Sequence, residues 1–229
     1  MRIEEGLHDW DLSPGAARTL QQALAARVED DRPLGRWTTI AAADVSHNRY
    51  ESRLYAGVVV VRRETFEEVD RSVVVQAARF PYVPGLLSFR EAPAVLDAFR
   101  ALETRPDVVI CDGQGQAHPR RFGLACHLGL WLGLPTIGCA KSRLHGSHEP
   151  PGEALGGVAP LYDHEESIGA VVRTRAGVKP LFVSVGHRCD IASAIQVVRE
   201  MTPRYRVPVP IRMAHVLVNE RRRADGLVS

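Results

Sequence analysis

Two aspartates stand where apolar segments end. Asp44 lies near the end of residues 38–45, and Asp112 directly follows residues 108–111. In an open α/β sheet, ligand chemistry gathers at the carboxyl ends of strands. Two neighbouring buried carboxylates repel each other unless a cation neutralises them, and hard oxygen ligands favour Mg²⁺ or Mn²⁺. If the two strands are neighbours, these residues predict a divalent metal site. The alternative is that each aspartate caps the turn after it.

Glu91 is a third candidate carboxylate. With Ser88 as N-cap, Glu91 would complete a capping box at the start of a helix. In that register Pro93 would be the fifth helical residue and would remove a helix hydrogen bond. We therefore expect the helix to begin near Arg90 or Glu91, which leaves Glu91 at the helix entrance and free to point elsewhere.

Lys141 follows a short apolar segment, residues 136–140, that is predicted to be a buried strand. A compact ammonium at this strand end can stabilise charge on a phosphate or orient an attacking water. Lys141 and Lys179 are the only lysines among the 29 lysine and arginine residues, which favours a specific need for lysine here. The alternative is a surface lysine at a strand end.

The predicted elements form a meander followed by α/β units. The apolar, β-branched segments over residues 38–45, 54–63 and 69–77 indicate an antiparallel meander. Further strands are predicted over residues 108–111, 136–140, 157–161, 168–173 and 180–185. Helices are predicted over residues 13–28 with Ser13 as cap, 91–103, 119–132, 190–200 with Asp190 as cap, and 211–223. This order predicts an α/β protein, a mixed sheet flanked by helices in one domain over residues 1–229.

Composition limits the class of protein. With 229 residues, 45% hydrophobic and 24% charged, the chain is typical of a globular protein and excludes dominant disorder. A net charge of +2 excludes a histone-like polycation. The four cysteines have no Cys-x-x-Cys spacing and indicate buried thiols in a reducing compartment. The sequence has no signal-peptide pattern and no apolar run of about 18 residues, so we expect a cytoplasmic protein with no membrane partner.

A stiff segment and a glycine-rich loop suit contact with a nucleic acid. Pro81 and Pro84 fix two φ angles around Tyr82, whose ring can unstack bases; the alternative is a rigid turn with Tyr82 packed on the core. Gly113, Gly115 and Gly123 allow close backbone approach. Phosphate contact is expected for Arg120 and Arg121 at a helix start, the alternative being a solvated helix face. His118 either contacts substrate, orients Asp112 or supports the loop.

Four motifs resemble those of the endonuclease V family, in the same order along the chain. They are residues 80–91 (FPYVPGLLSFRE), 112–125 (DGQGQAHPRRFGLA), 134–141 (LPTIGCAK) and 180–187 (PLFVSVGH). The resemblance extends from Asp44 to Glu220. It implies a ribonuclease H-like fold and Mg²⁺-dependent cleavage of a deoxyinosine-containing strand at the second phosphodiester 3′ of the lesion.

The resemblance also assigns roles to individual residues. Asp44, Glu91 and Asp112 match the metal-binding carboxylates, with Lys141 and His215 as further active-site residues. Pro81, Tyr82, Val83 and Pro84 match the wedge that replaces the extruded base. The pocket for that base is matched by Gly85, Leu87, Gly113, Gly123 and Leu124. The implied cofactor is Mg²⁺, with Mn²⁺ as a substitute, and the implied partner is DNA containing deaminated adenine, bound by a monomer.

The sequence departs from the family pattern at two positions and leaves other functions open. Gln114 stands where the family usually has histidine, which would weaken a supporting hydrogen bond. Val185 stands where proline usually precedes Gly-His, which would loosen a loop carrying His187. One alternative function is an inosine-specific endoribonuclease, since recognition of the 2′-OH decides between RNA and DNA. The other is an inactive ribonuclease H-like module that binds nucleic acid, against which the intact carboxylates argue.

Overall fold

The computed structural model describes residue 1, residues 3–47 and residues 52–226. In this part of the chain the helices are α1 (Pro14–Ala25), α2 (Leu87–Ala101), α3 (Leu124–Leu132), α4 (Ile191–Glu200) and α5 (Val209–Ala224). The strands are β1 (Thr39–His47), β2 (Arg53–Arg62), β3 (Glu68–Ala77), β4 (Val108–Cys111), β5 (Thr136–Ala140), β6 (Val158–Asp163), β7 (Glu166–Val172) and β8 (Leu181–His187).

One mixed sheet, in the order β3-β2-β1-β4-β5-β8-β7-β6, contains all the strands of the described residues. The first three strands pair antiparallel, which confirms the predicted meander. β1 then pairs parallel with β4, and β4 with β5. In the β1–β4 register Ala43 lies opposite Cys111, so the next residues, Asp44 and Asp112, reach the same edge of the sheet. The two strands are therefore neighbours, as the metal-site prediction required.

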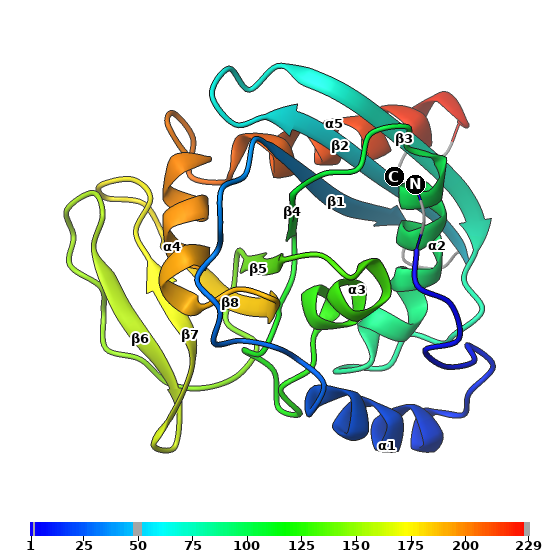
Figure 1. Ribbon diagram of the computed structural model, residues 1–229, viewed down its shortest axis with the longest axis horizontal. Coiled ribbons are helices and arrows are strands. Elements are labelled where there is room, and N and C mark those ends of the chain that lie inside the picture. The colour runs from blue at the N-terminus through cyan, green and yellow to red at the C-terminus, as the bar shows by residue number, and fades with distance from the viewer. Residues whose placement is uncertain (2, 48–51, 227–229) are drawn as a thin grey trace.

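Helices cover both faces of this sheet (Figure 1). On one face α2 packs over alternate side chains of the meander, among them Ala41, Val58 and Val60, and α3 packs over β4, β5 and β8. On the other face α5 packs over β1 and β2, where Ile40 and Val59 lie, and α4 packs over β7 and β8. The predicted mixed sheet flanked by helices is confirmed. None of the described helices combines the length and the apolar character that a membrane span requires.

Two helix starts were predicted wrongly. α2 begins at Leu87, before Glu91, and Pro93 lies inside it. Pro93 removes one hydrogen bond, but the helix buries a long stripe of side chains, which outweighs that loss. α3 begins at Leu124, five residues later than predicted, because Arg121 takes a left-handed conformation with φ 54° that no helix allows.

The remaining ends differ by a few residues. The β6–β7 hairpin extends beyond its apolar part, because backbone pairing continues out to Asp163 and Glu166. β8 runs on to His187, so Val185 and His187 lie within a strand; the expected loosened loop is absent from this described segment. Ser13 and Asp190 cap α1 and α4 as predicted, each accepting a hydrogen bond from a backbone N–H of its helix. The four cysteines are free and buried.

Gly57 of β2 tests how closely α5 must approach the sheet. Gly57 pairs with Asp44, and a Cβ added there would lie 2.6 Å from Cγ1 of Val218, a fully buried residue of α5. We expect Gly57→Ala to lower the free energy of unfolding by about 1–3 kcal/mol, measured by urea denaturation, because Val218 has no free space to enter. The control is Gly35→Ala, where an added Cβ meets nothing within 4 Å. Equal stability of Gly57→Ala and the parent would contradict this tight contact.

Candidate functional site

Three carboxylates approach one another at the carboxyl edge of the sheet. Asp44 points to the α5 face, because it alternates in phase with Ile40 and Ala42, which pack there. Glu91 comes from α2 on the opposite face and is only 7% exposed. Asp112 follows the end of β4. The sequence prediction that these carboxylates gather therefore agrees with where their elements lie.

Burial and mutual repulsion raise two of the carboxyl pKa values. The pKa of Glu91 rises to about 8, chiefly because the side chain is buried, and also because it faces the charges of Asp44 and Asp112. The pKa of Asp44 is raised by burial and by Asp112, against the opposing effect of His215. Each negative charge in this cluster is therefore unfavourable to its neighbours unless a cation compensates it.

His215 of α5 holds Asp44 through a network that fixes its tautomer. Ser46 Oγ donates to Asn219 Oδ1 (3.0 Å), which turns the Asn219 amide nitrogen toward His215. That nitrogen lies 3.2 Å from His215 Nε2, so Nε2 accepts. His215 Nδ1 then carries the hydrogen and donates to Asp44 Oδ2 at 2.8 Å. Asn219, one turn after His215, was not singled out from the sequence, although the four-residue spacing predicts a shared helix face.

Lys141 pairs with Asp112 on the other side of the cluster. The Lys141 ammonium lies against Asp112 Oδ2. The backbone of Lys141 is held in turn, because Arg206 Nη2 donates to its carbonyl oxygen at 2.8 Å. Lys141 is therefore the counter-charge of Asp112, and His215 is the hydrogen-bond partner of Asp44. Glu91 is the most buried carboxylate of the three.

The carboxylates fit a divalent cation by their chemistry. Within the described residues, no group of three or more His, Cys, Asp or Glu side chains is arranged to hold a metal ion. The pKa values of Asp44 and Glu91, however, are raised first by burial and then by repulsion from the neighbouring carboxylates, and a doubly charged ion would compensate that repulsion. Carboxylate oxygens are the ligands that Mg²⁺ and Mn²⁺ prefer.

A pocket of about 470 Å³ adjoins the carboxylates and shares Asp112 and Lys141 with them. Its walls include all five residues that the resemblance assigned to the base pocket: Gly85, Leu87, Gly113, Gly123 and Leu124. Tyr82, Val83 and Pro84 line its rim, and Pro81 precedes them as an exposed residue. Tyr82 is 65% exposed, so the alternative in which its ring packs on the core is wrong.

The carbonyl oxygen of Gly85 is a fixed point of this pocket. It accepts hydrogen bonds from Gln21 Nε2 (3.1 Å), His118 Nε2 (3.1 Å) and Arg120 Nη2 (2.7 Å). His118 Nδ1 accepts from the backbone N–H of Arg120, so both ring nitrogens have defined roles. Burial, followed by the charge of Arg120, lowers the pKa of His118 to about 4. His118 and Arg120 thus hold the backbone at Gly85, directly after residues 81–84, in place.

Arg121 has other partners. Its guanidinium pairs with Asp163 and Glu166 at the tip of the β6–β7 hairpin, 2.6 Å from each. Contact of Arg120 or Arg121 with a phosphate would therefore compete with internal hydrogen bonds, and it stays a prediction.

Gln21 is a functional candidate that the sequence did not single out. It projects from α1 into the buried stripe formed with Ala17 and Leu24, and it also donates to the carbonyl oxygen of Phe122 at 2.6 Å. A polar residue within the apolar stripe of an amphipathic helix was the available signal.

Gln114, the departure from the family pattern, lies in the pocket wall. Its Nε2 donates to the carbonyl oxygen of Ser142 at 3.0 Å. Its Oε1 is buried and has no hydrogen-bond partner in the described structure. A supporting hydrogen bond is therefore made by only one end of this amide.

Comparison with known proteins shows one consistent relationship. The family model for endonuclease V matches residues 20–216. Endonuclease V of Myxococcus xanthus is 48% identical over 227 residues, covering 99% of this chain and 97% of that protein. The crystal structure of the Streptomyces avermitilis endonuclease V has a TM-score of 0.90 and 42% identity, covering 95% and 96% of the two chains.

A third relative was crystallised with nucleic acid. It is the Ciona intestinalis endonuclease V in complex with a 24mer DNA containing an inosine followed by a ribo-adenosine. Its TM-score is 0.77 and its identity 25%, covering 91% of this chain and 97% of that one.

The raised pKa of Glu91 predicts a dependence of stability on pH in the cation-free protein. Folding favours the protonated carboxyl, so this stabilisation is complete below the unfolded value of 4.5 and is lost as the pH rises through about 8. Glutamine resembles the protonated form but does not ionise. We expect Glu91→Gln to match the parent near pH 4 and to exceed its free energy of unfolding by on the order of 1–3 kcal/mol above pH 8.

Urea denaturation in EDTA across this pH range measures the effect. Glu103→Gln, an exposed position beyond the end of α2, is the matched control. A difference between Glu91→Gln and the parent that does not change with pH would contradict the buried, ionisable Glu91.

Proposed function

The chain belongs to the endonuclease V family, and from that premise we propose that it is a DNA repair enzyme for deaminated adenine. It nicks a strand containing deoxyinosine at the second phosphodiester 3′ of the lesion. The observation that carries this proposal is the shared wall between the pocket and the carboxylate cluster, because Asp112 and Lys141 belong to both. Lesion recognition and strand cleavage can then occur on one bound strand.

Asp44, Glu91 and Asp112 would hold the divalent cation, Mg²⁺ with Mn²⁺ as a substitute. Such a cation, when bound, activates water and stabilises the charge of the reacting phosphate. Phosphodiester hydrolysis needs both effects. The cluster's excess negative charge supports this assignment, since the raised pKa values of Asp44 and Glu91 would return toward the usual range beside a cation.

Lys141 and His215 would position the reacting groups. The Lys141 ammonium is a compact charge that can turn from Asp112 to a non-bridging phosphate oxygen. His215 orients the Asp44 carboxylate by donating from Nδ1, and Asn219 keeps the ring in that tautomer. The role of His215 is therefore to hold Oδ2, while Oδ1 accepts from the backbone N–H of Val45 and keeps a further lone pair for a ligand.

The wedge would read the lesion by taking the place of an extruded base. Tyr82 presents an exposed ring between Pro81 and Val83 at the rim of the pocket. Unstacking a base step costs a few kcal/mol, and a mispaired inosine lowers that cost. The backbone of Gly85, held by three hydrogen bonds, gives the pocket a fixed wall for the extruded base.

An inosine-specific endoribonuclease is the second candidate function. The strand bound to the Ciona relative contains a ribo-adenosine after the inosine, so a ribonucleotide fits beside the lesion in that protein. An inactive nucleic-acid-binding module is a weaker alternative, because it does not account for three clustered carboxylates with a lysine. We further propose that the enzyme acts as a cytoplasmic monomer.

Cleavage of an inosine oligonucleotide tests the function directly. We expect one cut, at the second phosphodiester 3′ of inosine, in the presence of Mg²⁺. Asp44→Asn should lower kcat by about 10²- to 10³-fold, because the neutral amide retains the contact with His215 but removes one charge from the cluster. Asp97→Asn makes the same change at an exposed ion pair of α2 and should cut like the parent. End-labelled products on a sequencing gel locate the cut.

Random degradation, or no cut in any divalent metal, would contradict the proposed function. The same oligonucleotide made with ribose throughout separates the two enzyme functions. Faster cleavage of the RNA strand would favour the endoribonuclease.

Tyr82→Ala tests the wedge. The side chain is mostly exposed, so folding should be unchanged, while the loss of a stacking ring should raise KM for inosine DNA by about 5- to 50-fold. The affinity for Mn²⁺, measured by titration calorimetry, should not change. Tyr162→Ala, at another exposed tyrosine on β6, is the control. An unchanged preference for inosine over adenine in Tyr82→Ala would remove the wedge role.

A further inference from the structure

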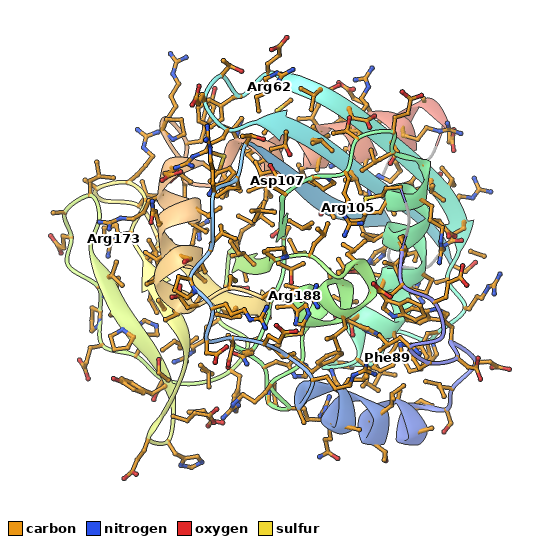
Figure 2. All side chains as sticks on the ribbon, viewed as in Figure 1. Arg62, Phe89, Arg105, Asp107, Arg173 and Arg188 are labelled. Carbon is orange, nitrogen blue, oxygen red and sulfur yellow. The ribbon has the colours of Figure 1, made fainter. Side chains whose placement is uncertain are left out.

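A second cavity, of about 670 Å³, lies away from the carboxylates and is lined by four arginines. Arg173 and Arg175 follow the end of β7, and Arg199 and Arg204 come from the end of α4 and the segment after it. Figure 2 labels Arg173 on the side of the molecule that β6, β7 and α4 form. We call this cavity the arginine pocket.

None of the four guanidinium groups has a carboxylate partner in the described part of the chain. Arg173 donates to the carbonyl oxygens of Gly152 and Val178, and Arg199 to that of Gly156. Arg175 donates to the carbonyl oxygen of Arg204. Across the described residues, no ion pair involves any of the four. Their charge is therefore not neutralised within the structure, unlike that of Arg63, Arg121 and Arg188.

The end of α4 accounts for only part of this charge. A helix C-terminus carries about half a negative charge, which suits one cation such as Arg199. The last carbonyl groups are also partly satisfied, because Thr202 Oγ1 donates to the carbonyl oxygens of Val198 and Arg199. Four guanidinium groups exceed what one helix end attracts, so the arginine pocket has a surplus of positive charge.

The lining indicates which ligand would compensate that charge. A guanidinium offers paired N–H donors that match the oxygens of a phosphate. The walls contain no aromatic side chain on which a base could stack; apart from the arginines they are formed by small or aliphatic residues such as Gly156, Leu155 and Thr174. The expected ligand is therefore the phosphate group itself.

One segment connects the arginine pocket with Lys141. Arg206 follows Arg204 closely, and its carbonyl oxygen accepts from Thr174 Oγ1 in the pocket wall at 2.6 Å. Its guanidinium donates to the carbonyl oxygen of Lys141. The intervening Tyr205 is 40% exposed, and the guanidinium carbon of Arg212 lies 4.0 Å from its ring centre. Arg206 thus bonds to both sites, with the exposed Tyr205 directly before it in the chain.

We propose that the arginine pocket is a phosphate site that holds the backbone of the nucleic-acid strand after it has passed the carboxylate cluster. The assignment to a strand rests on the proposed function, whereas the assignment to phosphate rests on the arginines alone. Free polyphosphate shares this chemistry and is the other possible source of the ligand.

The test variant is Arg175→Gln combined with Arg204→Gln. Both residues are exposed, and Arg173, which ties down two loop carbonyls, is left intact. The control is Arg62→Gln combined with Arg71→Gln on β2 and β3, at the other end of the strand order. Arg62 lies far from Arg173 in Figure 2. Both double variants remove the same charge.

Two measurements test the two parts of the proposal separately, the phosphate site and its use by a nucleic-acid strand. Calorimetric titration with inorganic tripolyphosphate tests the phosphate site without any nucleic acid, and we expect the test variant to bind at least 5-fold more weakly than the control. KM is then measured for a short inosine strand and for strands extended by about ten nucleotides on either side. For the strand that reaches the pocket, we expect a 3- to 10-fold higher KM in the test variant. The slope of log KM against log salt concentration should fall by about one to two, which corresponds to the loss of one to two phosphate contacts. The short strand and kcat should be unaffected.

Each outcome decides a separate point. Loss of both effects in the test variant supports the proposal. Weaker tripolyphosphate binding with unchanged KM for every strand overturns the strand assignment and points to free polyphosphate. Equal tripolyphosphate binding by test and control variants overturns the phosphate site. If the parent cuts no inosine strand but binds tripolyphosphate through these arginines, the proposed function fails and the phosphate site stands.

Discussion

Parallel pairing of β1 with β4 concentrates negative charge at one edge of the sheet, and the surrounding elements are arranged to compensate it. The register puts Asp44 beside Asp112, and α2 adds the buried Glu91 from the opposite face. Lys141 at the end of β5 and His215 on α5 then contact one aspartate each. The site therefore depends on elements from both layers, and its electrostatic strain is available to favour a bound cation.

The pocket beside the carboxylates is organised on a different principle. Its fixed point is a neutral backbone carbonyl, that of Gly85, which receives donors from α1 and from the loop before α3. Hydrogen bonds to one acceptor from separate elements restrict a loop that has no regular structure of its own. The carboxylate cluster and the pocket meet at Asp112 and Lys141, so the proposed cleavage and the proposed base recognition would use different forces on adjoining walls.

The sequence predicted the strands better than it predicted the surroundings of the candidate residues. Apolar segments that end in aspartate can be recognised in the sequence, but periodicity does not reveal which strands pair. The prediction that Asp44 and Asp112 meet therefore depended on the two strands being neighbours. Pro93 argued for a late start of α2, and burial of the helix outweighed one lost hydrogen bond. The left-handed backbone at Arg121 could not be predicted, because glycine is the residue that usually marks this conformation in a sequence. The arginine pocket joins distant segments and has no local pattern.

Gln21 gives the first helix a role that reaches beyond its own packing. Its amide is bonded to Gly85 and Phe122, which lie in two loops on either side of the pocket. Sliding α1 by one residue would move this amide away, so the Phe122 carbonyl would lose this donor and the Gly85 carbonyl would lose one of its three. The amphipathic helix could otherwise tolerate such a slip, because hydrophobic contacts are not directional. The Gln21 amide therefore fixes the position of α1 along its axis. The spacing of the two pocket segments that contain Gly85 and Phe122 then depends on a helix that contributes only this side chain to the described pocket wall.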